Sequence, residues 1–223
     1  MGMLLSIQDF DYFMASLRLD ELRKYLGVTD KYLRKAKEDF KAWADGEAKT
    51  LPPQQQQEFY EFYSDEYWRH EEKFPRILRN SFLVSAHSLL EYELNVICEK
   101  LRKDQEIAVS LSNFRGDELE RVKLFFKNAG LSLDYNSPTW QEINNYYLVR
   151  NSIVHNSGLI KGFKREKDLR TYITQKKIIS QDTIQEEVAL TEQFCEEVIN
   201  TMQSFLDEVY KVYITHKERV KSM

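Results

Sequence analysis

The stretch RILRNSFLVSAHSLLEYELNVICEKLRK, residues 76–103, decides the fold of this chain. Its apolar residues form two stripes at helical spacing, so almost every side of the helix is apolar. The stripes are Leu83, Ala86, Leu90, Leu94, Ile97 and Leu101, and Phe82, Leu89 and Val96. A helix that is apolar all round is buried on all sides, and Pro75 suits its first turn. The pattern therefore predicts the central helix of a helical bundle over about residues 75–102.

The composition also favours an all-α fold. The 223 residues include only 7 Gly and 4 Pro, too few for a sandwich or barrel with a turn after every short strand. Apolar residues make up 42% and charged residues 30%, which excludes a membrane-embedded or a disordered chain. No membrane partner is expected. The net charge of −4 argues against a protein that coats nucleic acid, but it leaves room for a local basic site.

Glycine positions predict where the helices before residue 75 end. One or two short helices are expected over residues 8–25, closed by Gly27, and a further helix is expected to stop near Gly46. Residues 46–53, GEAKTLPP, are typical of a linker. We therefore expect a boundary within residues 46–53.

This boundary divides the chain into an N-terminal helical extension over residues 1–50 and a helical domain over residues 55–223. The second part opens with an aromatic-rich helix. Its rings are Phe59, Tyr60, Phe62, Tyr63, Tyr67 and Trp68. Such rings can stack on nucleic-acid bases, but helical spacing is more typical of core packing.

Three more helices are expected over about residues 116–129, 138–155 and 186–216. Ser137 before Pro138 has the pattern of an N-cap followed by the first helical residue. The helical pattern is lost between the last two helices, where β-type composition allows a small β-hairpin near residues 172–180.

The two cysteines, Cys98 and Cys195, each lie in an apolar helical pattern without a CxxC motif or a nearby Cys/His pair. Two reduced core thiols are therefore expected, with no zinc site. The N-terminal residues have no basic region before an apolar run, so they do not have the pattern of a signal peptide. Together these features predict a cytoplasmic protein.

One motif carries chemistry: Arg150-Asn151-Ser152-Ile153-Val154-His155, at the end of the predicted helix over 138–155. Asn151 and His155 are four residues apart and share a face of the helix. Arg150 and His155 are five apart, which is about 140° around the helix. An Arg can hold a phosphate in a fixed fork, and a His can transfer a proton near neutral pH. Both suit RNA transesterification without a metal or a cofactor, and a two-fold dimer would supply a second His.

The motif resembles the Arg-polar-x(3–5)-His signature of the HEPN superfamily. The resemblance extends to the order of the helices and covers roughly residues 55–215. It implies a helical bundle in which Arg150 and His155 are the catalytic pair and Asn151 is the polar residue after the Arg. It also implies a metal-independent endoribonuclease that works as a homodimer, in toxin–antitoxin, abortive-infection or other defence systems. Some members of the superfamily are thought only to bind RNA or nucleotides.

Two residues of the central helix, Asn80 and Glu91, are candidates for supporting roles. They lie on the same side of the helix as His87. Because Glu is almost never buried unpaired, Glu91 either faces solvent, pairs with a cation or lines a site. The alternative is purely structural: Arg150 pairs with Glu91 to join two helices, and His155 complements the helix dipole.

The segment after the motif is basic. Residues 161–177 contain seven basic and two acidic side chains, a local charge of +5. Lys161, Lys164, Arg165 and Lys167 are the candidate RNA-binding residues. A solvated charged loop explains the same composition.

Three hypotheses follow from these patterns. The first is a HEPN-type homodimeric endoribonuclease, a toxin or phage-defence effector with an antitoxin or defence partner. The second is a non-catalytic module of the same fold that binds RNA, a nucleotide or a partner protein. The third is a helical scaffold in which Arg150 and Glu91 form an internal contact.

Overall fold

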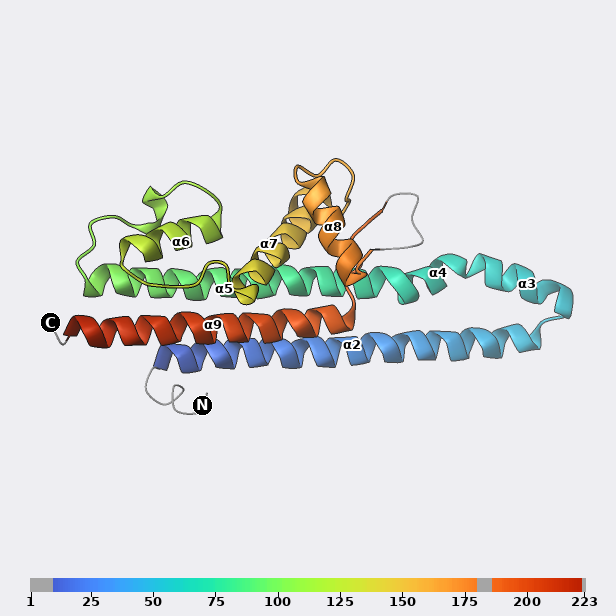
Figure 1. Cartoon of the computed structure of the whole chain (residues 1–223). Helices are drawn as coiled ribbons and strands as arrows, with labels where there is room; N and C mark the ends of the chain where they lie inside the picture. The colour runs from blue at the N-terminus through green and yellow to red at the C-terminus, as the bar shows by residue number, and fades with distance from the viewer. Residues whose placement is uncertain (1–9, 180–185, 222–223) are drawn as a thin grey trace.

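The computed structural model describes residues 10–179 and 186–221, and its fold is all-α, as the sequence predicts (Figure 1). The elements are α2 (Phe10–Thr50), α3 (Pro53–Phe62), α4 (Ser64–Trp68), the π-helical turn η1 (Arg69–Lys73), α5 (Phe74–Asp104), the 3-10 turn η2 (Leu111–Asn113), α6 (Glu118–Asn128), α7 (Pro138–Asn156), α8 (Glu166–Lys176) and α9 (Glu192–Lys221). None of the helices in these two ranges is long and apolar enough to cross a membrane.

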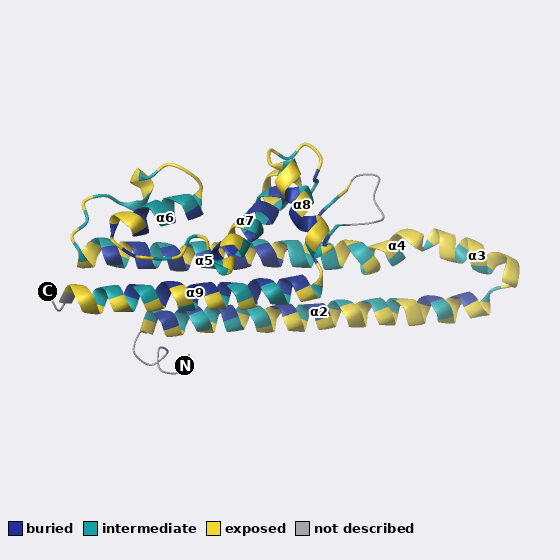
Figure 2. Ribbon diagram, viewed as in Figure 1, coloured by how far each residue is buried: buried dark blue, intermediate teal, exposed yellow. Residues whose placement is uncertain are grey.

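The helix α5 is the centre of the bundle, which confirms the prediction over residues 75–102. It contacts α2, α6, α7 and α9, so its apolar residues are buried on several sides. In Figure 1, α2, α9 and α5 run side by side, and α7 and α8 lie on the other side of α5 and α9 from α2. Figure 2 shows buried residues along much of α5 and α9.

The expected break at Gly27 and the linker over 46–53 were wrong. The helix α2 runs without interruption from Phe10 to Thr50, and the turn before α3 is reduced to residues 51–52. A glycine inside a helix costs about 1 kcal/mol relative to alanine. Burial of Leu19 and Leu26, in the turns of α2 that precede Gly27, outweighs this cost, and both residues belong to the same core as α5 and α9.

The end of α2 and the segment α3–α4–η1 form a helical hairpin that extends beyond the bundle (Figure 1). Ring contacts hold the two arms together: Phe40 lies 5.0 Å from Tyr67, and Trp43 lies 5.1 Å from Tyr63, measured between ring centroids. The expected core packing was wrong for these rings: they pack against one another, but none of them is buried, and Phe62 is 79% exposed.

The expected β-hairpin near 172–180 was wrong within the described residues. Residues up to Lys176 belong to α8, because Leu169, Tyr172 and Ile173 are buried at helical spacing. Two isolated antiparallel bridges, Leu159–Glu187 and Ile179–Val188, are the β-type pairing there. Because residues 187 and 188 form these bridges, the last helix begins at residue 192 rather than at 186. Residue 180 of the expected hairpin lies outside the described residues.

The two cysteines are confirmed as free, buried thiols in the helical core. Burial is the main cause that raises the pKa of Cys195 to about 12, and it also raises the pKa of Cys98. Neither thiol is poised to act as a nucleophile at neutral pH.

Shortening one buried side chain of the central helix tests this packing. Leu94 is fully buried in α5, so Leu94→Ala is expected to lower the free energy of unfolding by about 2–5 kcal/mol. Urea denaturation measures the change. The matched control is Ser88→Ala on the exposed face of α5, which is expected to change stability by less than about 0.5 kcal/mol. Equal effects of the two variants would contradict a buried α5.

Candidate functional site

The helix α7 carries the motif, and both of its ends are fixed. Ser137 is the N-cap: its Oγ accepts a hydrogen bond from the backbone N–H of Trp140 at 3.2 Å, as the sequence predicts. At the other end, Ser157 and Gly158 have φ of 55° and 79°, a left-handed turn that stops the helix. The N–H of Gly158 donates to the carbonyl of Ser152 at 3.0 Å.

The loop after α7 is tied to the chain that leads into α9. The N–H of Val188 donates to the carbonyl of Gly158 at 2.9 Å, and the N–H of Ile160 donates to the carbonyl of Glu186 at 3.1 Å. The Asn156 side chain donates to the carbonyl of Leu159 at 2.6 Å. The last turn of α7, which presents His155, is therefore held in place from both sides.

The structure brings Arg150, Asn151 and His155 to one part of α7. The Nη1 of Arg150 donates to the Oδ1 of Asn151 at 3.0 Å, so the guanidinium turns from its own face toward that of Asn151. His155 is exposed, one helical turn beyond Asn151 on the same face. The Nε of Arg150 is buried and has no hydrogen-bond partner among the described residues. The hydrogen bond therefore connects Arg150 to Asn151, whose face of the helix His155 shares.

Behind this group, α5 places Glu91 among cationic side chains. Its Oε1 lies 3.3 Å from the Nδ1 of His87, which is fully buried. The neighbouring His87 ring is the main cause that lowers the pKa of Glu91, and the charges of Arg150 and Arg121 lower it further, against the effect of burial. The Glu91 side chain is 24% exposed and lies beside His87, so of the three roles left open, pairing with a cation and lining a site are the ones that the structure supports.

The sequence assigned no role to His87. It is a fully buried His on the same side of α5 as Glu91, and its ring lies 5.1 Å from that of Tyr147 in α7. A lone His on an apolar helix gives no indication of function by itself, because its neighbours come from another helix.

Asn80 lies at a different place in the site. A Cβ atom built on Gly158 would lie 4.0 Å from the Nδ2 of Asn80, so this side chain is beside the loop after α7. Its Oδ1 is buried and makes no hydrogen bond within the described part of the chain. Asn151 therefore contacts Arg150 directly, and Glu91 interacts with Arg150 through their opposite charges. Asn80 lines the turn that follows α7.

The basic segment divides into paired and exposed cations. Arg165 pairs with Asp168 at 2.9 Å and Arg170 with Glu166 at 3.1 Å. Lys176 pairs with Glu142 and Glu197 at 2.8 and 2.9 Å. The exposed lysines of the segment are Lys161, Lys164, Lys167 and Lys177. The local charge of +5 is therefore partly neutralised, and Lys161, Lys164 and Lys167 are the cations free to meet a ligand beside the motif.

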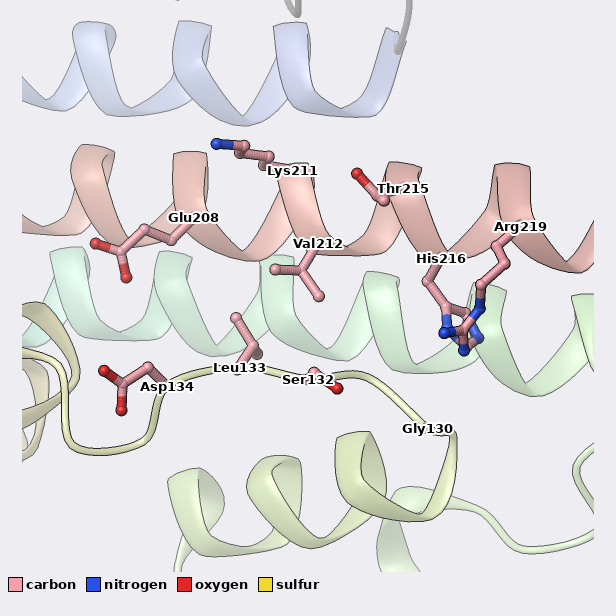
Figure 3. A pocket seen from close by; sticks show the side chains of 10 residues that line it. All are labelled: Gly130, Ser132, Leu133, Asp134, Glu208, Lys211, Val212, Thr215, His216 and Arg219. Carbon is pink, nitrogen blue, oxygen red and sulfur yellow. The ribbon is translucent and has the colours of Figure 1, made fainter.

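The cleft drawn in Figure 3 is elsewhere, between the loop after α6 and the C-terminal part of α9. It measures about 450 Å³, with His216 and Arg219 at one end and Asp134 and Glu208 at the other. Burial, and then the charge of Arg219, lowers the pKa of His216. Arg150 and His155 do not line this cleft, so we place the candidate site on the surface of α7 by its chemistry rather than by concavity.

Comparisons of the chain with protein-family models, with curated proteins and with solved structures found no match. Over residues 10–179 and 186–221, no group of three or more His, Cys, Asp or Glu is placed to hold a metal ion. The HEPN resemblance thus stays a prediction.

The lowered pKa of Glu91 predicts how stability depends on pH. The ionised carboxylate favours the folded chain, because its pKa there is below the ordinary value of 4.5, and this contribution is lost as the pH falls through the folded value. Glu91→Gln is expected to lower the free energy of unfolding at neutral pH. The difference in this free energy between the variant and the wild type is expected to become smaller below about pH 4. Urea denaturation at several pH values measures the gap.

The matched control is Glu38→Gln, a change to an exposed glutamate of α2. We expect this variant to follow the wild type at every pH. A constant gap for Glu91→Gln across the acid range would show that the carboxylate is not stabilised in its ionised form.

Proposed function

We propose that this chain is a metal-independent endoribonuclease of HEPN type that acts as a homodimer. RNA lies over the last turns of α7, Arg150 holds the scissile phosphate, and His155 transfers a proton. Asn151 orients Arg150, and Glu91 and Asn80 support the site from α5.

The observation that carries this proposal is the hydrogen bond from Arg150 to Asn151, 3.0 Å long. It draws the guanidinium toward the face on which His155 is exposed. A bound phosphate can therefore contact a delocalised cation and an imidazole together, although the two residues start on different faces of α7. The C-terminal end of a helix favours a protonated imidazole, so His155 can also act as an acid.

The reaction that suits these groups is attack by the RNA 2′-oxygen on the adjacent phosphorus. A base takes the 2′-hydroxyl proton, the bond from phosphorus to the 5′-oxygen breaks, and an acid protonates that leaving oxygen. The products are a 2′,3′-cyclic phosphate and a 5′-hydroxyl. One His per chain supplies one of these roles, so we propose that His155 of the partner subunit supplies the other across a two-fold axis.

The surroundings of the motif fit an anionic polymer. Lys161, Lys164 and Lys167 are exposed directly after α7, where they can contact phosphates without reading base sequence. Two free, buried thiols suit a reducing compartment, so we place the protein in the cytoplasm. We propose a toxin or phage-defence role, held in check by an antitoxin or defence partner.

A substitution of His155 tests the catalytic role. His155→Ala is expected to lower RNA cleavage in the presence of EDTA by about 100-fold or more, because proton transfer contributes roughly that much. The fold is expected to stay intact, since His155 is exposed. Cleavage of a labelled RNA measures the rate, with detection of the cyclic phosphate end.

The matched control is His216→Ala, which removes a histidine of α9 that lies beside Gln105. We expect wild-type cleavage from this variant. A His155→Ala protein that cleaves RNA as fast as the wild type would contradict the nuclease proposal.

A second candidate is the non-catalytic module, and the placement of Glu91 favours it. The charge of Arg150 helps to keep Glu91 ionised. The negative charge of Glu91 therefore compensates part of the positive charge that Arg150 offers to a phosphate. In that case Arg150→Ala weakens RNA binding and no cleavage product appears. If Arg150 is only an internal contact, the same variant lowers the melting temperature and leaves RNA binding unchanged.

The exposed lysines give a separate prediction about RNA affinity. A triple change of Lys161, Lys164 and Lys167 to Ala is expected to reduce the slope of log K against log salt by about 2, because three phosphate contacts are lost. Binding of a single-stranded RNA at several salt concentrations measures the slope. Arg170→Ala is the control, since Arg170 already pairs with Glu166. Equal slopes for the triple variant and the wild type would remove this segment from the RNA site.

A further inference from the structure

The helix α2 has two apolar faces, whereas a surface helix of a globular domain usually has one. One face is buried against the core and contains Tyr12, Ala15, Leu19 and Leu26. The other face, which we name the outer stripe, is exposed to solvent. It consists of Phe10, Phe13, Leu17, Tyr25, Val28 and Tyr32, and the exposed fraction of its side chains rises to 74% at Phe10 and 71% at Tyr32.

The outer stripe lies opposite the buried face. With 100° between successive residues, Phe10, Leu17 and Val28 fall within about 20° of one another, and Leu19 and Leu26 lie about 160–180° away. From Phe10 to Tyr32 the stripe is roughly 33 Å long. Two groups of exposed apolar side chains on one face of a helix mark an interaction site.

Charged residues lie at the middle of the stripe. Glu21 and Lys24 are both exposed there, between the apolar groups at its two ends. Lys24 pairs with Asp20 of its own helix at 2.7 Å, an exposed contact that can be exchanged for another at little cost. The order along the helix is therefore apolar, acidic, basic, apolar.

This order is complementary to itself when the helix is reversed. We propose that the outer stripe binds the outer stripe of a second copy of this chain, antiparallel and about a two-fold axis. The register places Leu17 against the partner's Val28 and Phe13 against the partner's Tyr32. Glu21 then faces the partner's Lys24, and Lys24 faces the partner's Glu21.

The charges select this arrangement over the alternatives. A parallel pair of the same helices would place Glu21 beside the partner's Glu21 and Lys24 beside the partner's Lys24, which is unfavourable. The antiparallel register joins opposite charges and covers the apolar residues on both sides of them. A two-fold axis uses each contact twice, so one stripe serves as both halves of the interface.

The interface is separate from the site proposed for RNA. The helices α2 and α7 both contact α5 and α9, and they lie on opposite sides of them (Figure 1). Pairing through α2 therefore leaves His155 exposed. If the copies also meet at α7, each chain has two separate interfaces, and an assembly of four chains forms where the two two-fold axes are perpendicular and intersect.

The test is the mass of the protein in solution, measured by light scattering across a wide range of concentrations. Leu17→Glu is expected to reduce self-association through α2. Glu21→Lys and Lys24→Glu, each alone, are expected to weaken it by about tenfold, because each creates two like-charge contacts per dimer. The double variant Glu21→Lys/Lys24→Glu restores opposite charges and is expected to recover wild-type association. Circular dichroism checks the fold, and these exposed positions are not needed for it.

A cross-link tests the register independently of mass. Leu17→Cys mixed with Val28→Cys is expected to form a disulfide-linked pair under oxidation, whereas Leu17→Cys alone is not. The natural thiols are buried and do not compete. A wild-type chain that stays monomeric, a dimer that all the charge variants leave unchanged, or cross-linking of Leu17→Cys to itself would overturn the proposal.

Discussion

The burial of α5 is the constraint on which the rest of this structure depends. A helix of 31 residues with apolar side chains on nearly every side must be covered by several neighbours, and α2, α6, α7 and α9 supply that cover. Ion pairs fix how the neighbours sit. Glu93 of α5 is almost fully buried and its carboxylate lies 2.6 Å from Arg18 of α2, while Arg79 of α5 bonds the buried Asp30 of α2 at 2.9 Å. Burial raises the pKa of Glu93, and Arg18 opposes that rise. Removal of either partner would leave a charge without compensation inside the bundle.

The same helix also determines what surrounds the motif. Two polar side chains of α5, His87 and Glu91, lie on the side of α5 toward α7, so they are placed behind Arg150. The motif is held by an unusually well-fixed helix end, because the left-handed turn at Ser157 and Gly158 is joined by backbone hydrogen bonds to residues 186–188. A phosphate-binding site requires that the side chains that contact the ligand are held rigidly by the residues behind them. A charged Glu91 is equally what an internal contact between α5 and α7 requires.

The sequence predicted α5 and α7 closely, because their signals are local: an apolar pattern on all faces, and a Ser-Pro start with a glycine after the end. It failed at Gly27, where a local preference was outweighed by the burial of Leu19 and Leu26, which depends on helices more than 150 residues away in the chain. It failed again around Tyr172 and Ile173, whose β-type composition concealed helical spacing. In the site, the residue types were visible, but the contact of Arg150 with Asn151 and the place of His87 depend on side-chain direction and on a second helix. The two faces of α2 were hidden for the same reason, since a helix that is apolar on opposite sides has no single periodic stripe.

The hairpin at the far end of α2 has far fewer buried residues than the bundle. Beyond residue 30 the buried residues of α2 are only Ala44 and Ala48, and α3, α4 and η1 bury none. Contacts among half-exposed rings stabilise this end, while a continuous core stabilises the bundle. The hairpin can therefore open as a unit of its own while α5 and the motif behind it remain folded.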